Sequence, residues 1–400
     1  MRLTTTAGKT SMALLIALAL SHFFNDMLQA IITAVYPLLK SDMALSFAQI
    51  GAITLCYQTS ASVFQPVMGM LLDKKPNPYF LPLGMTFTYS GLTILAFSDS
   101  YAVILFSVSL VGLGSSILHP EASRLTSLAS GGKRGFAQSV FQVGGNTGSA
   151  VGPLLAALLI APYGRSHVAA VACLAFVGML VMFPICRWYS SHLKAVKKGE
   201  GRRSVKQPQP LRRRHTIQAI AILLALIFSK YLYMASLTSY YTFYLIEKFG
   251  VSIKTSQVLL FVFLGATAIG TVIGGPIGDK IGRKYVIWAS ILGTAPFALL
   301  MPHVSFVPTI VLSFLVGLVL SSAFPAIIIY AQELLPNHIG LTSGLFYGFA
   351  FGIAGISAAV LGTLVDSYGI GAVYQACSFI PLLGMVAYFL PNLKKTDKQH

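Results

Sequence analysis

The sequence predicts an all-α integral membrane protein with twelve transmembrane helices in two pseudo-symmetric six-helix bundles. Three observations predict this fold class. First, the 400 residues are 55% hydrophobic and only 10% charged, with a mean hydropathy of +0.75, whereas about a quarter of the residues of a soluble domain are charged. Second, long apolar blocks alternate with short charged gaps. Third, a charged signature at residues 275–284 recurs in weaker form at residues 69–75.

Twelve apolar blocks are long enough to cross a bilayer, which takes about 20 helical residues. In the first half they occupy residues 12–37, 47–72, 79–98, 101–128, 136–162 and 167–189. In the second half they occupy residues 217–246, 254–278, 285–303, 306–333, 339–366 and 370–391. Because the first block continues as far as Tyr36, we interpret it as an uncleaved helix and not as a signal peptide.

The lysines and arginines indicate how these spans are oriented. With the N-terminus inside, most of them fall in cytoplasmic segments, and the opposite side holds only Lys40, Arg165, Lys248 and Lys254. Because cytoplasmic loops carry an excess of Lys and Arg, both termini are expected in the cytoplasm. This distribution accounts for the formal net charge of +17 without a nucleic-acid partner, and leaves membrane lipids as the expected surroundings.

A nearly constant offset relates the two halves of the chain. The two copies of the signature lie 206 residues apart, and three further pairs of landmarks lie 205 apart: Pro120 and Pro325, Gly135 and Gly340, Phe141 and Phe346. The halves are therefore expected to be homologous six-helix bundles, over residues 1–189 and 217–400. Residues 190–216 are basic and rich in Pro and Gln, which is typical of a flexible cytoplasmic linker.

The signature has a physical rationale as a cytoplasmic gate latch. Gly275 allows two helix ends to approach closely, and Asp279 can accept hydrogen bonds from the amides at the N-terminus of another helix. Gly282, Arg283 and Lys284 complete the signature, and the two basic side chains hold the loop at the membrane surface. Such contacts would close the gate in one state and release it in the other.

The N-terminal copy of the signature is less complete. It keeps Gly69 and Asp73, but Pro76, Asn77 and Pro78 stand where the C-terminal copy has a glycine and two basic residues, so a plain charged turn is the alternative reading there. Glu333 lies near another predicted cytoplasmic boundary, where we expect a gating or capping residue.

A few ionisable residues lie within the apolar blocks, where they are costly and therefore point to function. Asp26 lies near the middle of the first span, with His22 one helical turn earlier and Asn25 beside it. His119, Glu121 and Arg124 lie toward the cytoplasmic end of the fourth span, Lys230 in the middle of the seventh, and Tyr231 and Tyr233 follow it.

The offset between the halves places Lys230 at the same depth as Asp26, so we expect the two to face each other. We predict Asp26 as the first proton carrier and Glu121 as the second, since a carboxylate in a partly dry cavity can load and release protons. The cations, the histidines, Asn25 and the two tyrosines would bind an anionic substrate. A buried ion pair that only closes the bundle is the alternative for Asp26 with Lys230, and equally for Glu121 with Arg124.

The fifth span carries Gly148-x-x-x-Gly152-Pro153, preceded by Gly144-Gly145. Glycines four residues apart form a flat stripe for close helix packing, and Pro153 bends the helix. Phosphate-binding loops and nucleophile–base constellations are not evident, and the four cysteines lack metal-ligand spacing, so we expect no enzyme activity, no cofactor and no metal. A proton gradient would supply the energy.

Twelve spans in two halves, each with Gly-x-x-x-Asp-Lys after its second span, resemble the major facilitator superfamily. The resemblance implies two bundles that rock about a central midplane site, and the fifth-span Gly-Pro motif resembles that of its proton-coupled exporters. We expect a monomer. Several stretches, including Ser21–Met27, Leu118–Arg124 and Phe228–Ser236, resemble bacterial inner-membrane exporters of anionic phosphonate drugs. Proton-coupled uptake of a small anionic metabolite and a non-transporting membrane sensor are the alternatives.

Overall fold

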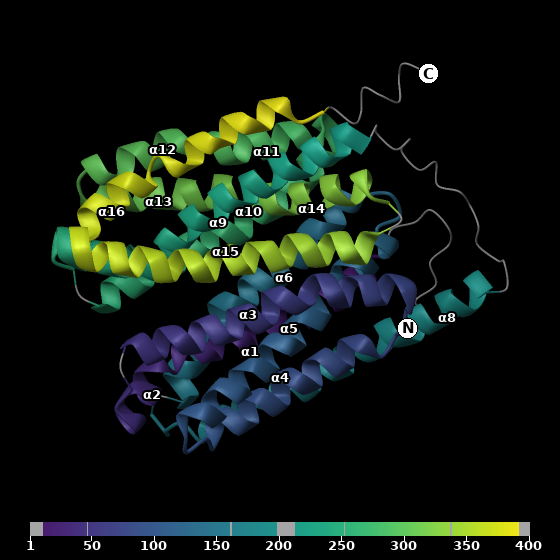
Figure 1. Ribbon diagram of the computed structural model, residues 1–400, viewed down its shortest axis with the longest axis horizontal. Coiled ribbons are helices and arrows are strands. Elements are labelled where there is room, and N and C mark those ends of the chain that lie inside the picture. The colour runs from purple at the N-terminus through teal and green to yellow at the C-terminus, as the bar shows by residue number, and fades with distance from the viewer. Residues whose placement is uncertain are drawn as a thin grey trace. The chain divides into compact units, whose positions relative to one another are not determined.

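The computed structural model describes residues 11–45, 47–160, 162–197, 213–251, 253–336 and 338–391. Each of the twelve predicted spans is helical over the residues described (Figure 1), which confirms the predicted fold class. Most of the predicted linker 190–216 and the C-terminal tail from residue 392 lie outside the described residues.

The first half of the chain supplies six spans. These are α1 (Met12–Ala34), α3 (Phe47–Lys74), α4 (Phe80–Ala96), α5 (Tyr101–Ala129), α6 (Arg134–Leu155), and α7 (His167–Ala172) followed by α8 (Leu174–Lys197). A short helix, α2 (Tyr36–Met43), follows α1, and a π-helical turn, η1 (Ala156–Ile160), follows α6. This turn begins three residues after Pro153, a residue type that has no backbone amide to donate to the regular α-helical ladder.

The second half supplies the other six. They are α9 (Arg213–Phe249), α10 (Ile253–Ile281), α11 (Arg283–Leu292) with α12 (Ala295–Leu300) and η2 (Met301–His303), α13 (Phe306–Ser321) with α14 (Ala323–Leu334), α15 (Ile339–Tyr368), and α16 (Ile370–Cys377) with η3 (Ile380–Phe389). Among the residues described, nine helical stretches are long and apolar enough to cross a membrane, and α4 is a shorter apolar helix.

Contacts divide the chain into two compact units. Unit 1 comprises Met1–Gln207 together with Leu335–Gly348, and unit 2 comprises Pro208–Leu334 together with Phe349–His400. The first ten residues of α15 therefore belong to unit 1, and the rest of the helix belongs to unit 2. The bundle boundaries at residues 189 and 217 stay a prediction.

In unit 1, α3 and α4 both pack along α5, and α6 packs along α1 (Figure 1). Glycines bring the last pair together. A Cβ atom on Gly144 would lie 2.0 Å from the carbonyl oxygen of Ala19, and one on Gly148 would lie 2.2 Å from that of Phe23. Because any side chain would push the backbones apart, the glycine stripe sets the distance between α1 and α6.

In unit 2, α10 packs along α13, and α9 packs against η3 and α16. A Cβ atom on Gly270 would lie 1.9 Å from the carbonyl oxygen of Leu318, and one on Gly274 would lie 2.2 Å from the Ser322 Cβ. Small residues thus bring helices together in both units, as expected where lipid gives helices no hydrophobic reason to associate.

Candidate functional site

Three ionisable side chains meet in unit 1. The Asp26 carboxylate on α1 lies between two imidazoles: its Oδ2 is 3.1 Å from the Nε2 of His22, and its Oδ1 is 3.4 Å from the Nε2 of His119 on α5. The His22 and His119 side chains are 3% and 1% exposed and that of Asp26 is 17% exposed. We call this group the His–Asp–His cluster.

Backbone carbonyls fix the orientation of both imidazoles. The Nδ1 atom of His22 lies 2.9 Å from the carbonyl oxygen of Phe141, and that of His119 lies 2.9 Å from the carbonyl oxygen of Ser115. Because a carbonyl oxygen can only accept, each Nδ1 carries the hydrogen. In a neutral ring, the Nε2 atom that faces Asp26 then bears a lone pair.

The surroundings of the cluster are closely fitted. His22 stacks on the Phe141 ring at 4.1 Å, and the Asn25 amide donates to the Asp26 Oδ1 at 2.9 Å. A Cβ atom on Gly145 would lie 2.5 Å from the His22 Nε2 and 2.7 Å from the Asp26 Oδ2. Glycine at position 145 therefore makes room for the cluster.

The same three residues can also hold a cation. Their ligand atoms all lie within 4.8 Å of one another. Among the described His, Cys, Asp and Glu side chains, these three form the one group that could hold a metal ion. Two imidazoles and one carboxylate are ligands that suit Zn²⁺ and related transition metals.

A second buried charged group lies on the opposite face of α5. Arg124 donates to both Glu121 oxygens, Nε to Oε2 at 2.9 Å and a terminal nitrogen to Oε1 at 3.0 Å. The same terminal nitrogen donates to the hydroxyl of Tyr189 on α8. Glu121 is 1% exposed and Arg124 12%. The predicted pair is thus a bidentate ion pair, and its arginine also contacts Tyr189 of α8.

A polar network joins α6 to the start of α15. The Gln138 amide donates to the Tyr347 hydroxyl at 3.0 Å, and this hydroxyl donates to the Gln142 Oε1 at 2.7 Å. The Tyr347 ring lies 5.3 Å from the ring of His119. The network therefore reaches the His–Asp–His cluster.

The N-terminal copy of the signature makes a specific contact with α15. The two Asp73 oxygens accept from the backbone amides of Gly340 and Leu341, each at 2.9 Å. A Cβ atom on Gly69 would lie 2.1 Å from the Gly340 carbonyl oxygen. The reading of this copy as a plain charged turn was wrong, because Asp73 accepts hydrogen bonds from the N-terminus of another helix.

The C-terminal copy forms a different arrangement in unit 2. Arg283 donates to the Asp279 Oδ1 at 3.2 Å and lies 3.1 Å from the Glu333 Oε1 on α14. Gly282 adopts a φ of +109° between α10 and α11, which favours glycine. Lys284 donates to the carbonyl oxygen of Tyr388 at 2.7 Å. Glu333, predicted as a gating residue, thus lies beside the signature.

Lys230 is buried in unit 2 and has no anionic partner among the residues that the structure describes there. Its side chain is 4% exposed. Its Nζ atom lies 5.5 Å from the centre of the Tyr231 ring and 5.3 Å from that of Phe324. Among the described residues of unit 2, no hydrogen bond or ion pair to this ammonium group is formed.

Tyr233, also predicted to bind substrate, is 1% exposed, and its hydroxyl has no hydrogen-bond partner among the described residues. Asp26 lies in unit 1 and Lys230 in unit 2. Their expected face-to-face arrangement stays a prediction.

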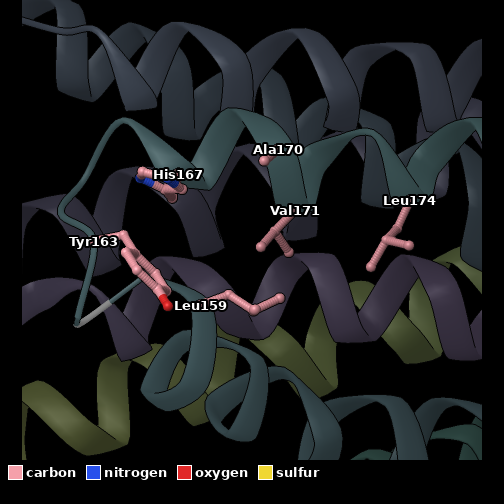
Figure 2. Close-up of a pocket in the computed structure, with 6 residues that line it drawn as sticks. All are labelled: Leu159, Tyr163, His167, Ala170, Val171 and Leu174. Carbon is pink, nitrogen blue, oxygen red and sulfur yellow. The ribbon is translucent and has the colours of Figure 1, made fainter.

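Two apolar cavities lie apart from these groups. One, of about 280 Å³, lies in unit 1 between η1 and the helices α7 and α8 (Figure 2). Tyr163 and His167 mark one end of it, with their rings 5.3 Å apart. The other, of about 270 Å³, lies in unit 2 between α10, α11 and α13. Both are lined mainly by aliphatic side chains on partly exposed faces.

Several residues of the site were not predicted from sequence. Gly145 was noted in the sequence as part of the Gly144-Gly145 pair, but its contact with His22 was not predicted. Gln138 and Gln142 lie one helical turn apart within an apolar span, a polar pattern that could have marked the network. Nothing in the sequence indicates the carbonyl partners of the histidines or the contact of Tyr189.

Comparisons with known proteins agree with this fold. The family model of the Major Facilitator Superfamily matches residues 18–258 and 222–400. The chain is 54% identical to the fosmidomycin resistance protein of Escherichia coli K12 over 98% of this chain and 96% of that protein. It is 40% identical to the uncharacterized transporter YfnC of Bacillus subtilis over the same shares.

Solved structures show the same fold. The transporter FucP in an outward conformation superposes with a TM-score of 0.70 at 17% identity, covering 94% of this chain and 98% of that one. A human organic anion transporter superposes with a TM-score of 0.72 at 14% identity, over 95% and 99%. The predicted resemblance is confirmed by the 54% identity to the fosmidomycin resistance protein. The chain is a multi-pass membrane transporter of the Major Facilitator Superfamily.

Proposed function

We propose that the chain exports fosmidomycin-like anionic phosphonates from the bacterial cytoplasm, in exchange for protons and by alternating access. The observation that carries the proposal is Lys230, a buried cation without an anionic partner among the described residues of unit 2. This cation belongs to a transporter that is 54% identical to a fosmidomycin resistance protein along nearly its whole length.

Lys230 has the properties of an anion-binding group. An ammonium group in a low-dielectric interior is costly, and Lys and Arg within membrane spans mark substrate pathways when nothing in the fold neutralises them. The rings of Tyr231 and Phe324 offset part of this cost through cation–π contacts. A phosphonate would offset far more. The buried Tyr233 hydroxyl supplies a hydrogen-bond donor in the same helix.

The proton-coupling role belongs first to Asp26. Two imidazole Nε2 atoms face its oxygens at 3.1 and 3.4 Å. A proton on either Nε2 turns that contact into a charge-assisted hydrogen bond. A second proton can bind the Nε2 of the other imidazole. The His–Asp–His cluster can therefore hold protons in steps, which a proton-driven exporter needs. His22, Asn25 and His119 would act with Asp26, as substrate contacts or as proton partners.

Glu121 is the second proposed proton carrier. In this structure both its oxygens accept hydrogen bonds from Arg124. Protonation of Glu121 would remove the charge that holds Arg124 and leave the guanidinium free to bind an anion. Proton loading and substrate binding would then use the same arginine in alternation.

The gate is proposed to use both copies of the signature. Asp73, with Gly69, would hold the N-terminus of α15 in one state and release it in the other. Gly275, Asp279, Gly282, Arg283 and Lys284, together with Glu333, would form the corresponding group in unit 2. Gly148, Gly152 and Pro153 would keep α6 close to α1 throughout the cycle.

We place the protein in the bacterial inner membrane as a monomer, with both termini in the cytoplasm. The charge distribution described above supports this orientation. No organic cofactor is required in this proposal, because the proton gradient supplies the energy.

Proteoliposomes with an imposed pH gradient and radiolabelled fosmidomycin test the function. We expect the drug to move against its own gradient, opposite to the protons, and an uncoupler to abolish this movement. Drug movement in the same direction as the protons would instead support uptake, and no flux at all would support a membrane sensor.

Two variants test the residue roles in the same assay. Lys230→Ala should weaken drug binding at least about tenfold, since a charge-assisted contact contributes about 1.5–3 kcal/mol. Asp26→Asn should abolish proton-driven transport and leave exchange of labelled for unlabelled drug. Unchanged affinity in the first variant, or intact proton-driven transport in the second, would overturn the assigned role.

A further inference from the structure

We propose that His22, Asp26 and His119 form a binding site for one divalent transition-metal ion of the Zn²⁺ type, and that this ion blocks transport. The metal site follows from the positions of the ligand atoms. Only the predicted block of transport rests on the function proposed above.

The distances within the cluster fit a shared metal. Imidazole nitrogens and carboxylate oxygens bind Zn²⁺ at about 2.0–2.2 Å, so two ligands at tetrahedral angles lie about 3.3–3.5 Å apart. The His22 Nε2 lies 3.1 Å from the Asp26 Oδ2 and the His119 Nε2 lies 3.4 Å from the Asp26 Oδ1, and one ligand atom from each of the three residues lies within 4.8 Å of the other two. Small side-chain adjustments suffice to place one ion among them.

Each ligand is already oriented by an outer partner. The Nδ1 atoms of His22 and His119 donate to backbone carbonyls, and the Asn25 amide donates to the Asp26 Oδ1. Metal-binding histidines almost always donate their other ring hydrogen to a carbonyl or carboxylate, which fixes the ring and directs the free nitrogen at the metal. The cluster has this second layer for all three of its members.

The charge of the cluster favours a dication. With both rings neutral and Asp26 ionised, the cluster carries one negative charge, and lone pairs on two nitrogens point at carboxylate oxygens. A cation placed among these atoms removes that repulsion. Three protein ligands leave a fourth position of a tetrahedral site open, which a water molecule or an anionic substrate oxygen can take.

Direct binding tests the site independently of transport. The full chain is purified without a histidine tag, freed of metal with a chelator, and titrated with ZnCl₂ by calorimetry. We expect one tight site per chain. Loss of an outer partner typically costs 10–100-fold in metal affinity, so His22→Gln, Asp26→Asn and His119→Gln should each cost at least about 100-fold. His303→Gln, on an exposed histidine in unit 2, is the matched control and should bind normally.

Spectroscopy on the unmodified chain covers the case in which the variants fail to fold. X-ray absorption of the Zn²⁺-loaded protein should show two imidazoles at about 2.0–2.1 Å together with oxygen ligands. The proposal is overturned if the wild-type chain has no tight site, if tight binding survives in the folded cluster variants, or if the spectrum lacks two imidazoles.

A flux assay then separates the metal site from the proposed function. Zn²⁺ should inhibit fosmidomycin transport at the concentrations at which it fills the site. If Zn²⁺ binds there and transport is unaffected, the claim that the ion blocks transport is wrong, while the site itself stands. If the wild type transports drug but binds no Zn²⁺, the proposed metal site is wrong and the proposed export function stands.

Discussion

The Asp73 carboxylate accepts a hydrogen bond from the backbone amide of Gly340 at 2.9 Å, where α15 begins. Its second oxygen accepts from the next amide, that of Leu341, at the same distance. The first amides of a helix have no partner within the helix, and the helix dipole favours a negative charge there. A single side chain of α3 thus satisfies two donors of α15, a helix whose later residues belong to the other unit.

Replacing Asp73 with Asn should therefore weaken this contact. Asn keeps the shape but loses the charge, and one of its two terminal atoms is a donor that would face a backbone amide. We expect a loss of about 1.5–3 kcal/mol for the charged hydrogen bonds and a several-fold change in drug flux. Thermal unfolding in detergent and proteoliposome flux measure the two effects. Asp99→Asn, on a 98% exposed side chain, should change neither.

The close approach of α1 and α6 predicts a second position at which a substitution should lower stability. A Cβ atom on Gly148 would lie 2.2 Å from the Phe23 carbonyl oxygen, so Gly148→Ala should force α6 away from α1. Overpacking of this kind costs about 1–3 kcal/mol. A Cβ atom on Gly265 in α10 would have no neighbour within 4 Å, so Gly265→Ala should be neutral or slightly stabilising. Equal unfolding temperatures for the two variants would contradict this packing argument.

The architecture could be predicted from sequence because it follows from local properties. The lengths of the apolar blocks define the spans, and the repeated offset between the halves matched Pro325 with Pro120 in sequence without any knowledge of contacts. The pairing of Glu121 with Arg124 was also predictable, because residues three apart on a helix are neighbours.

Contacts between distant segments were not predictable in the same way. His119 follows Asp26 by 93 residues, and only the packing of α1 against α5 and α6 brings the two side chains together. The N-terminal signature was judged by its missing basic residues, yet its function as an acceptor needs only Gly69 and Asp73. The helix that these two residues contact is α15, which carries glycines at regular spacing: Gly340, Gly344 and Gly348. This pattern was not recognised in the sequence.

The buried pair of Glu121 and Arg124 predicts a strongly non-additive pair of substitutions. Removal of one partner leaves an uncompensated buried charge, which typically costs about 3–5 kcal/mol, whereas replacement of both by apolar residues is often nearly neutral. We therefore expect Glu121→Leu and Arg124→Met to be destabilising singly and much less so together. Thermal unfolding of the four proteins in a double-mutant cycle measures the coupling. A double variant as unstable as the sum of the single variants would contradict a direct pair.

Replacing Lys230 with an apolar residue should make the protein more stable and lower its affinity for the drug. Because its ammonium group is buried with no anion in the described part of unit 2, Lys230→Met should raise the unfolding temperature while drug binding falls. Lys248→Met provides the contrast, since Nζ of Lys248 donates to the Tyr244 hydroxyl at 2.9 Å and to the Pro302 carbonyl at 2.6 Å. That variant should lose stability and keep its affinity. A destabilised Lys230→Met protein would show that the ammonium group has a structural partner after all.

Tyr347 links the start of α15 to the His–Asp–His cluster, so its hydroxyl should matter for coupling. The hydroxyl accepts from Gln138 and donates to Gln142, while the ring lies 5.3 Å from that of His119. Tyr347→Phe keeps the ring and leaves two buried amide groups short of a partner, at a cost of about 1–3 kcal/mol.

Tyr240→Phe is the matched control for Tyr347→Phe, because its hydroxyl donates to the Ala358 carbonyl within unit 2. Both variants should unfold at lower temperature, since each loses a hydroxyl that is hydrogen-bonded in the fold. Only Tyr347→Phe should change the number of protons exchanged per drug molecule, because its hydroxyl connects α15 to α6, the helix whose Phe141 stacks on His22 of the cluster. Parallel measurement of proton and drug flux gives that ratio. An unchanged ratio in Tyr347→Phe would mean that the network supports the fold without taking part in coupling.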